Sequence, residues 1–121
     1  MDVSPQIFMD CVFCKIAKKE IPAEIFFEDE DILGFKTINP AAPVHLLFIP
    51  RYHIEWKEDF SDKDLMMLGK LISVAKKFAI KKNIFSACKM IFNIGKIGQI
   101  KHIHLHLIGG WEEGEMPQDK T

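Results

Sequence analysis

Three histidines at two-residue spacing lie near the end of this 121-residue chain. They are His102, His104 and His106, and they are separated by Ile103 and Leu105. Successive side chains of a β-strand point to opposite faces, so a strand here would place the imidazoles on one face, about 7 Å apart. Such a row can ligate a metal, attack phosphorus or hold a phosphate near neutral pH. We expect all three rings to face a cleft, with the apolar residues in the core.

A single histidine on a strand is usually a surface residue or a hydrogen-bonded core residue. Three histidines on one face seldom arise without a use, because polar residues of this type rarely cluster by accident. The spacing therefore favours a functional site.

The chain has three cysteines, an odd number that argues against a disulfide framework and fits a reducing compartment. Cys11 and Cys14 form a Cys-x-x-Cys pair. On spacing alone this pair is half of a metal site, a redox pair or two buried thiols. Cys88 lies in an apolar stretch, and we expect it to be a buried structural thiol.

A glycine-bearing loop, residues 95–99, directly precedes the histidine strand. Its backbone amides can approach phosphate oxygens closely, because glycine adds no side chain. Glycines in such a connection more often serve the turn itself. The position of the loop beside the histidines nevertheless favours a phosphate contact.

The elements that position these residues are predicted in the order α-β-β-β-α-β-β. The first helix is expected over residues 7–20, with Asp10 as its N-cap, and the second starts at Ser61 and Asp64 and runs to 81–83. Consecutive strands with short connections imply an antiparallel sheet with helices on one side, which is an α+β fold. The expected strands cover residues 24–28, 32–38, 44–49, 88–92 and 100–108.

The long second helix carries apolar residues at helical spacing, and we expect this stripe to lie on the sheet. Its members are Leu65, Leu68, Ile72, Ala75 and Ala79. A group of lysines is expected to be a solvated face. These are Lys76, Lys77, Lys81 and Lys82.

The composition indicates one domain over residues 1–121, with residues 1–6 and 111–121 as flexible or extended tails. Hydrophobic residues make up 48% and charged residues 27%, and the formal charge of -1 gives no general attraction to nucleic acid or an anionic membrane. No apolar run approaches the ~20 residues of a membrane span, and the start lacks a signal pattern. We expect a cytoplasmic protein.

Together these pieces resemble the histidine triad (HIT) family, whose mark is His-x-His-x-His followed by apolar residues. The Gly109-Gly110 pair resembles the Hint branch, purine nucleoside phosphoramidases, more than the Fhit branch of dinucleoside polyphosphate hydrolases. The resemblance implies a HIT-like fold with about five antiparallel strands, a short N-terminal helix and one long helix. Further segments match in the family's order along nearly the whole chain: Cys11-x-x-Cys14-Lys15-Ile16 and residues 20–23, 26–29, 42–50 and 51–54.

The resemblance implies nucleotidyl transfer to water through a covalent histidine intermediate. His104 would attack the α-phosphorus of a nucleoside 5'-phosphoramidate or a related AMP or GMP derivative. A neutral imidazole nucleophile needs one nitrogen free and the proton of the other held by an acceptor, and a backbone carbonyl can supply that acceptor. His106 would donate to a non-bridging phosphate oxygen, and His45 would support the triad strand.

Substrate contacts follow from the same resemblance, with a purine nucleotide or nucleotide conjugate as the ligand. Asn93, Gly98 and Gln99 would line the phosphate and ribose side. An apolar nucleoside pocket would be built from Phe13, Ile16, Phe35 and Ile38. Plain membership of the core is the alternative for these four residues.

The resemblance to HIT proteins that begin with Cys-x-x-Cys implies a structural zinc ion. Its ligands here would be Cys11, Cys14, His53 and His102, and two thiolates with two imidazoles suit tetrahedral Zn²⁺. Amides of the first helical turn would lower the pKa values of the thiols. Under this interpretation His102 is structural, and the chemistry itself needs no metal.

Three features depart from the Hint pattern. Thr37 stands where that pattern has an acidic residue that holds ribose hydroxyls. The segment 93–102 is shorter than usual and lacks a phosphate-binding hydroxyl. The tail from Trp111 to Pro117 is acidic and lacks the tryptophan-diproline ending.

Three other functions stay open: cleavage of dinucleoside polyphosphates, a nucleotide-binding or protein-interaction module with little turnover, and a catalytic metal held by all three triad histidines. The family is usually dimeric, and we expect a homodimer here. The long helix carries more apolar surface than one face can bury, through Leu65, Met66, Met67 and Phe78.

Overall fold

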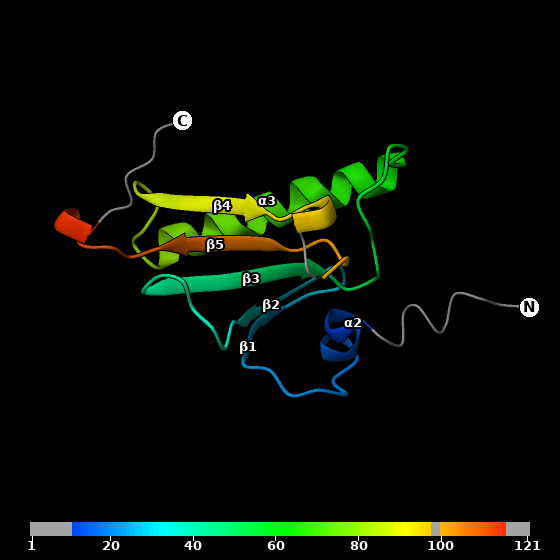
Figure 1. Ribbon diagram of the computed structural model, residues 1–121, viewed down its shortest axis with the longest axis horizontal. Coiled ribbons are helices and arrows are strands. Elements are labelled where there is room, and N and C mark those ends of the chain that lie inside the picture. The colour runs from blue at the N-terminus through cyan, green and yellow to red at the C-terminus, as the bar shows by residue number, and fades with distance from the viewer. Residues whose placement is uncertain (1–10, 98–99, 116–121) are drawn as a thin grey trace, which may run out of the picture.

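The computed structural model describes residues 11–97 and 100–115 of the chain. Five strands form one antiparallel sheet in the order β1-β2-β3-β5-β4 (Figure 1). This confirms the predicted α+β fold with a five-stranded sheet. The strands are β1 (Ile25–Glu28), β2 (Ile32–Lys36), β3 (Val44–Pro50), β4 (Cys88–Phe92) and β5 (Leu105–Gly109).

The two helices lie on opposite faces of this sheet, so the expectation of helices on one side is wrong. The long helix α3 (Asp62–Lys81) packs on the face that presents Leu46 and Phe48. The short helix α2 (Val12–Ala17) packs on the face that presents Leu47 and Ile49. Four successive buried apolar residues in β3 are typical of a strand that is covered on both faces.

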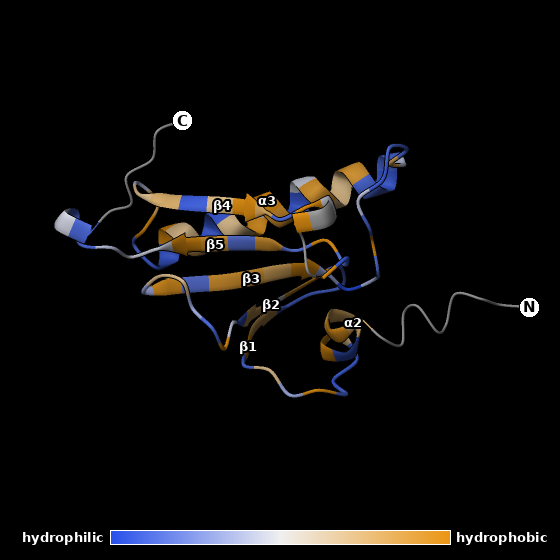
Figure 2. Cartoon of the chain, viewed as in Figure 1, coloured by the Kyte–Doolittle hydropathy of each residue, from blue (hydrophilic) through white to orange (hydrophobic). Residues whose placement is uncertain are grey.

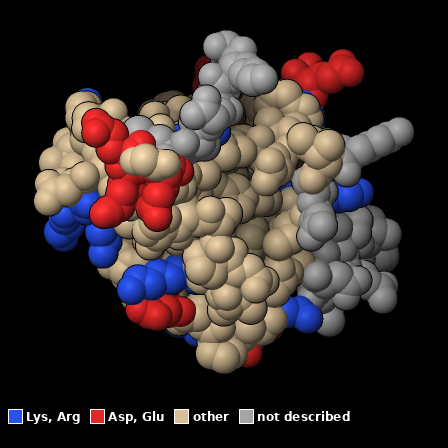
Figure 3. All heavy atoms as spheres, turned by 60° about the vertical axis from the view of Figure 1, so that its left-hand side comes forward, with Lys and Arg blue, Asp and Glu red and all other residues tan. Residues whose placement is uncertain are grey.

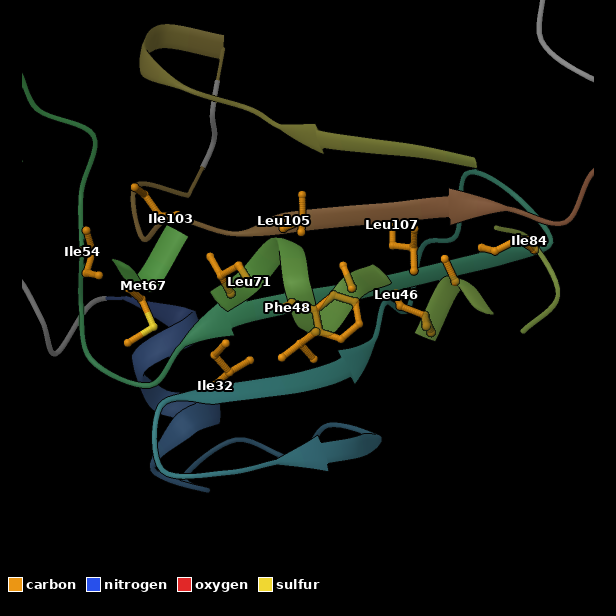
Figure 4. Packing of buried hydrophobic residues seen from close by; sticks show 13 residues of the cluster. Ile32, Leu46, Phe48, Ile54, Met67, Leu71, Ile84, Ile103, Leu105 and Leu107 are labelled. Atoms are coloured by element: carbon orange, nitrogen blue, oxygen red, sulfur yellow. The ribbon is translucent and has the colours of Figure 1, made fainter. Parts of the chain in front are cut away.

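The larger core lies between α3 and the sheet, and Figure 4 shows its side chains interleaved there. Leu105 and Leu107 of β5 are fully buried in this layer, as the alternation of the histidine strand predicts. Figure 2 shows apolar residues along β3 and β5, which occupy the centre of the sheet. The histidine strand is therefore fixed by a paired neighbour on each side.

The buried face of α3 differs in part from the predicted stripe. Leu65 is 53% exposed and Ile72 is 46% exposed, whereas Ala75 and Ala79 are buried as expected. The remaining buried positions include Met67, Leu71 and Val74. The helix carries apolar residues on a second stripe, so spacing alone could not decide which stripe meets the sheet.

Both helix starts use side-chain caps. In α3, Ser61 and Asp64 form the predicted capping box, in which each side chain accepts from the other residue's backbone amide. In α2 the N-cap is Cys11, whose Sγ accepts from the amide of Cys14 at 3.4 Å. The expected N-cap Asp10 and the expected helix start at residue 7 lie outside the described residues.

The last strand is shorter than predicted, because β5 begins at Leu105 rather than at residue 100. Residues 95–97 form a short 3₁₀ turn, as do residues 113–115 within the predicted tail. Cys88 is only partly buried, contrary to expectation. The tail at 1–6 and the end of the other tail, 116–121, lie outside the described residues.

The surface carries no strong separation of charge on the face seen in Figure 3, where acidic and basic side chains lie beside one another. The four lysines near the end of α3 are exposed, as predicted. Among the described residues, no helix has the length and hydropathy that crossing a membrane requires.

Candidate active site and metal centre

The three triad histidines occupy different environments. His106 lies on β5 opposite Leu47 of β3 and is half-buried. His104 and His102 precede the strand, with exposed fractions of 6% and 0%. The expectation that all three rings face a cleft is wrong for His102, because the chain before Leu105 leaves the regular strand and turns this ring toward the cysteines.

His102 belongs to a cluster with Cys11, Cys14 and His53, whose potential ligand atoms all lie within 4.8 Å of one another. The Sγ of Cys14 lies 3.2 Å from Nδ1 of His53 and 3.5 Å from Nδ1 of His102, and the Sγ of Cys11 lies 3.4 Å from Nδ1 of His102. Sulfur and nitrogen ligands of tetrahedral Zn²⁺, at about 2.3 Å and 2.0–2.1 Å from the metal, lie roughly 3.5 Å apart. The donor set and its spacing therefore fit zinc.

The remaining nitrogens of both imidazoles have acceptors, which fixes the tautomers that such a metal needs. Nε2 of His102 donates to the carbonyl oxygen of Pro50 at 2.9 Å. Nε2 of His53 donates to Oε2 of Glu55 at 2.9 Å. Each Nδ1 is then free for the ion, an arrangement common around histidine ligands of zinc.

Cys14 and His102, the buried members of the cluster, are held in their uncharged forms. Burial, and then the neighbouring Cys11, raises the pKa of Cys14 to about 12, so without a metal this thiol keeps its proton rather than having the lowered pKa that was expected from helix amides. Burial lowers the pKa of His102 to about 4, which keeps this ring in its neutral, ligating form. Bound Zn²⁺ would displace the thiol protons, and its charge would offset the cost of burying two thiolates.

His104 has one nitrogen held and one free. Its Nδ1 donates to the carbonyl oxygen of His102 at 2.8 Å, which is the backbone acceptor that a neutral nucleophile requires. The ring of Phe13 packs edge-on against it, with centroids 5.0 Å apart. Burial lowers the pKa of His104, so Nε2 carries a lone pair at neutral pH.

A series of hydrogen bonds determines which ring nitrogen of His106 carries the proton. The backbone amide of Ala41 donates to Nδ1 of His45 at 2.9 Å, so a neutral His45 carries its proton on Nε2. That nitrogen lies 2.9 Å from Nδ1 of His106 and donates to it. The proton of His106 is therefore on Nε2. Nδ2 of Asn93 lies 3.4 Å from this nitrogen, and because two N–H groups cannot bond each other, the Asn93 amide pairs with it only when its oxygen is turned toward the ring.

A cavity of about 620 Å³ opens beside His104 and His106 on the α2 face of the sheet. Its lining includes Asn93 and all four residues predicted for a nucleoside pocket: Phe13, Ile16, Phe35 and Ile38. Ile38 is 93% exposed and stands at the mouth, whereas Phe13, Ile16 and Phe35 form part of the smaller core. Gly98 and Gln99 lie outside the described residues.

Sequence reasoning missed several residues of this site. Leu47 lines the cavity because it faces His106 across the sheet, and the alternation in β3 was the available signal. Glu55 holds His53, and no pattern in the sequence marks that contact. Trp56 and Lys101 line a second cavity that also reaches His104.

Comparisons with known proteins identify the family. A family model described as "Scavenger mRNA decapping enzyme C-term binding" matches residues 10–120. Protein HitA of Neisseria gonorrhoeae is 39% identical over 102 residues, which cover 83% of this chain and 95% of that protein. The chain belongs to the histidine triad family. The expected family is thus confirmed, whereas its Hint branch remains an expectation.

Solved structures of the family agree with the fold. A HIT family hydrolase from Legionella pneumophila has 42% identity and a TM-score of 0.79, covering 85% of this chain and 95% of its own. A histidine triad protein from Clostridium difficile has 32% identity and a TM-score of 0.82, covering 99% and 100%. A zinc-bound HIT protein from Mycobacterium smegmatis has 27% identity and a TM-score of 0.77, covering 91% and 81%. These relatives agree with the expectation of a HIT family hydrolase.

Proposed function

We propose that this HIT protein hydrolyses nucleoside 5'-phosphoramidates or related AMP and GMP derivatives at the α-phosphorus, with His104 as the nucleophile. The observation that carries the proposal is the bond from Nδ1 of His104 to the carbonyl of His102. It leaves the opposite nitrogen with a lone pair at the wall of an apolar cavity. A held proton and a free lone pair are what imidazole needs for attack on phosphorus.

The reaction has two displacements. Nε2 of His104 forms a bond to phosphorus while the bond from phosphorus to the leaving amine breaks, and that electron pair departs with the amine, which takes up a proton. Water then forms a bond to phosphorus and loses a proton while the bond from phosphorus to Nε2 breaks. The electron pair of that bond returns to His104, and the nucleoside monophosphate is released. The carbonyl of His102 stabilises the positive charge that forms on the ring of His104.

His106 is assigned to the developing phosphate charge. Its Nε2–H borders the same cavity as His104, and the centroids of the two rings are 4.9 Å apart. A donor fixed in this way can bind a non-bridging oxygen without reorganising during the reaction. Asn93, which borders the same space, is proposed to bind the phosphate or ribose side.

The apolar end of the cavity is proposed to hold the purine. Phe13 and Phe35 pack edge to face at 5.6 Å, and Ile16 lies beside them in the smaller core. Thr37 also lines the cavity, and its hydroxyl accepts from the amide of Asn39 at 3.2 Å. Apolar walls with a few polar groups are typical of small-molecule sites.

Zinc is proposed as a structural ion bound by Cys11, Cys14, His53 and His102. When bound, it would supply the positive charge that holds two thiolates near His102. The triad itself is a poor catalytic metal site, because Nδ1 of His106 accepts from His45 and its Nε2 carries the proton, which leaves Nε2 of His104 as the one free ring nitrogen of the pair. The ring of His102 is directed to the cysteines.

A homodimer is proposed from the second apolar stripe of α3. Met66 is 72% exposed, Leu65 53% and Ile72 46%, so these apolar side chains of one helix are uncovered in the monomer. Met90 on the edge strand β4 is 38% exposed. Partner contacts over α3 and β4 would cover both regions.

Substitution of His104 tests the proposed reaction. His104→Ala is expected to abolish turnover of adenosine 5'-phosphoramidate, while Cys88→Ser, remote from the cavity, retains the parental rate. Parental turnover by His104→Ala would refute the nucleophile. Tight binding of AMP without turnover by the parental protein would instead favour a binding module.

A further inference from the structure

A second cavity of about 310 Å³ also reaches His104. It shares Asn93, Ile100 and His104 with the larger cavity and extends to Glu55, Trp56 and Lys101. The larger cavity is apolar over much of its wall and contains His106, whereas the second does not reach His106. A substrate that spans both cavities would therefore place its reacting phosphorus beside His104.

The position of this cavity suits the group that departs. In a displacement at phosphorus, the entering and leaving atoms lie roughly in line, so the leaving group departs from the side of phosphorus that faces away from Nε2 of His104. With the nucleoside in the larger cavity, a leaving group that extends from phosphorus past Asn93 would enter the second cavity, which shares Asn93 and His104 with the first. Its size allows one planar ring system.

Trp56 makes this cavity suited to an aromatic group. The indole packs on Phe60 with centroids 5.5 Å apart, yet the residue is 57% exposed, so much of its surface is uncovered. The backbone two residues before it is held to the chain ahead of β5, where the amide of Ile103 donates to the carbonyl of Ile54 at 2.7 Å. An anchored indole with a free surface stacks well on planar rings.

Charge at the cavity comes from Glu55 and Lys101. The carboxylate of Glu55 is engaged with Nε2 of His53. Within the part of the chain that the structure describes, Lys101 is exposed and has no ion-pair partner. Its ammonium group favours an anionic linker between the scissile phosphorus and the ring.

We propose that this second cavity is the leaving-group subsite and that Trp56 stacks on a planar aromatic ring of the leaving group. The inference rests on the proposed function, because it assumes a substrate whose phosphorus is attacked by His104. The ring has two chemical sources. It belongs either to an aromatic amine or to a second nucleoside joined through phosphates.

A pair of substrates tests the subsite by turnover. They are adenosine 5'-phosphoramidates whose nitrogen carries either an indolylethyl group or a methyl group. Trp56→Ala in the zinc-loaded full chain is expected to lower kcat/KM by about tenfold or more for the indolyl substrate and by less than about twofold for the methyl substrate. The control Phe85→Ala removes an aromatic residue that is 58% exposed at the far end of the sheet, and it should change neither value.

A binding measurement decides the proposal even where turnover is absent. Trp56 and Trp111 are the two tryptophans, so Trp111→Phe leaves Trp56 as the single indole reporter. Diadenosine tetraphosphate is expected to quench the emission of Trp56, whereas AMP, which fills only the larger cavity, is not. Lys101→Met should weaken this quenching.

The outcomes separate the two ring sources and the two proposals. A Trp56-dependent preference for the indolyl substrate identifies an aromatic amine, and selective quenching by the dinucleotide identifies a second nucleoside. Equal losses on both phosphoramidates combined with equal or absent quenching by both nucleotides would overturn the subsite. Absence of any phosphoramidate turnover by the parental protein counts against the proposed function, while the quenching result still decides the subsite.

Discussion

Nε2 of His45 lies 2.9 Å from Nδ1 of His106, and this contact determines which nitrogen of His106 carries the proton. The direction of this series of hydrogen bonds is set at Ala41, because its backbone amide can only donate. A backbone donor four residues before His45 thus directs the N–H of His106 toward the cavity. The N–H group of His106 is therefore oriented to bond a phosphate oxygen before a substrate binds.

Loss of His45 is therefore expected to slow catalysis without unfolding the protein. His45→Ala should lower kcat by about tenfold, less than the roughly 10²–10³-fold expected for removing the donor itself in His106→Ala. His45→Gln, whose amide can still donate to Nδ1, should recover part of the loss. Steady-state kinetics with thermal melting as a fold control test this, and a parental kcat for His45→Ala would contradict it.

The pH profile should reflect two histidines that stay neutral. Burial lowers the pKa of His104, and burial followed by the neighbouring His104 and His45 lowers the pKa of His106 to about 4. Both rings stay neutral to a lower pH than an ordinary histidine, so kcat should stay level as the pH falls through 6.5, the ordinary histidine pKa. Activity should decline only below that value, as acid protonates the nucleophile and, toward about pH 4, His106.

The lowered pKa of His106 also makes the free energy of unfolding fall as the pH falls. Between pH 6.5 and about 4 the unfolded chain binds more protons at position 106 than the folded chain does. The stabilisation is present above pH 6.5 and is lost progressively as the pH falls. Initial rates from pH 5 to 8, with recovery checked at neutral pH, test the profile; an acid limb centred near 6.5 would contradict it.

Zinc affinity should depend on Glu55. Glu55→Ala removes the acceptor of the Nε2–H of His53 and is expected to weaken zinc binding by about 10–100-fold. Glu55→Gln keeps a neutral acceptor and should lose less. Competition with a chromogenic chelator measures both, and parental affinity in Glu55→Ala would show that this contact does not support the metal.

The dimer is expected to depend on the exposed stripe of α3. Met66→Lys places a charge at a position that is 72% exposed and should yield monomers without unfolding the chain. Lys18→Glu, at an exposed residue that follows α2 on the opposite face of the sheet, serves as a charge-change control and should remain dimeric. Light scattering over a concentration series reports the result; a parental protein that is monomeric throughout would contradict the prediction.

The sequence predicted the sheet well because its strands carry strong local signals. The alternation of Leu105 and Leu107 with histidine placed the core face of β5 correctly, and the Ser61–Asp64 capping box placed the start of α3. The Cys-x-x-Cys pair and two histidines, predicted from the family resemblance, come together from three separate segments. Local sequence patterns predicted the strands and the helix start, and the motif order shared with the family predicted the Cys/His cluster.

Other features depend on packing that spacing does not encode. The α3 helix has two apolar stripes, so the choice of Met67 and Leu71 over Leu65 and Ile72 is made by the sheet beneath. His102 shares the α2 face with His104, because Phe13 packs on both rings, but the cysteines that cover it come from a distant segment of the chain. The contact of Trp56 with Phe60, and the backbone bond between residues 54 and 103 nearby, are marked by no sequence pattern.

A trapped intermediate tests the central claim most directly. His106→Ala keeps the nucleophile but slows both displacements, so rapid mixing with adenosine 5'-phosphoramidate followed by acid-free quenching and peptide mass spectrometry should detect AMP on the peptide that contains His104. His104→Gln is the matched control and should carry no adduct. If the parental protein turns over the substrate while no adenylate appears on His104 of the His106→Ala variant, the account is contradicted.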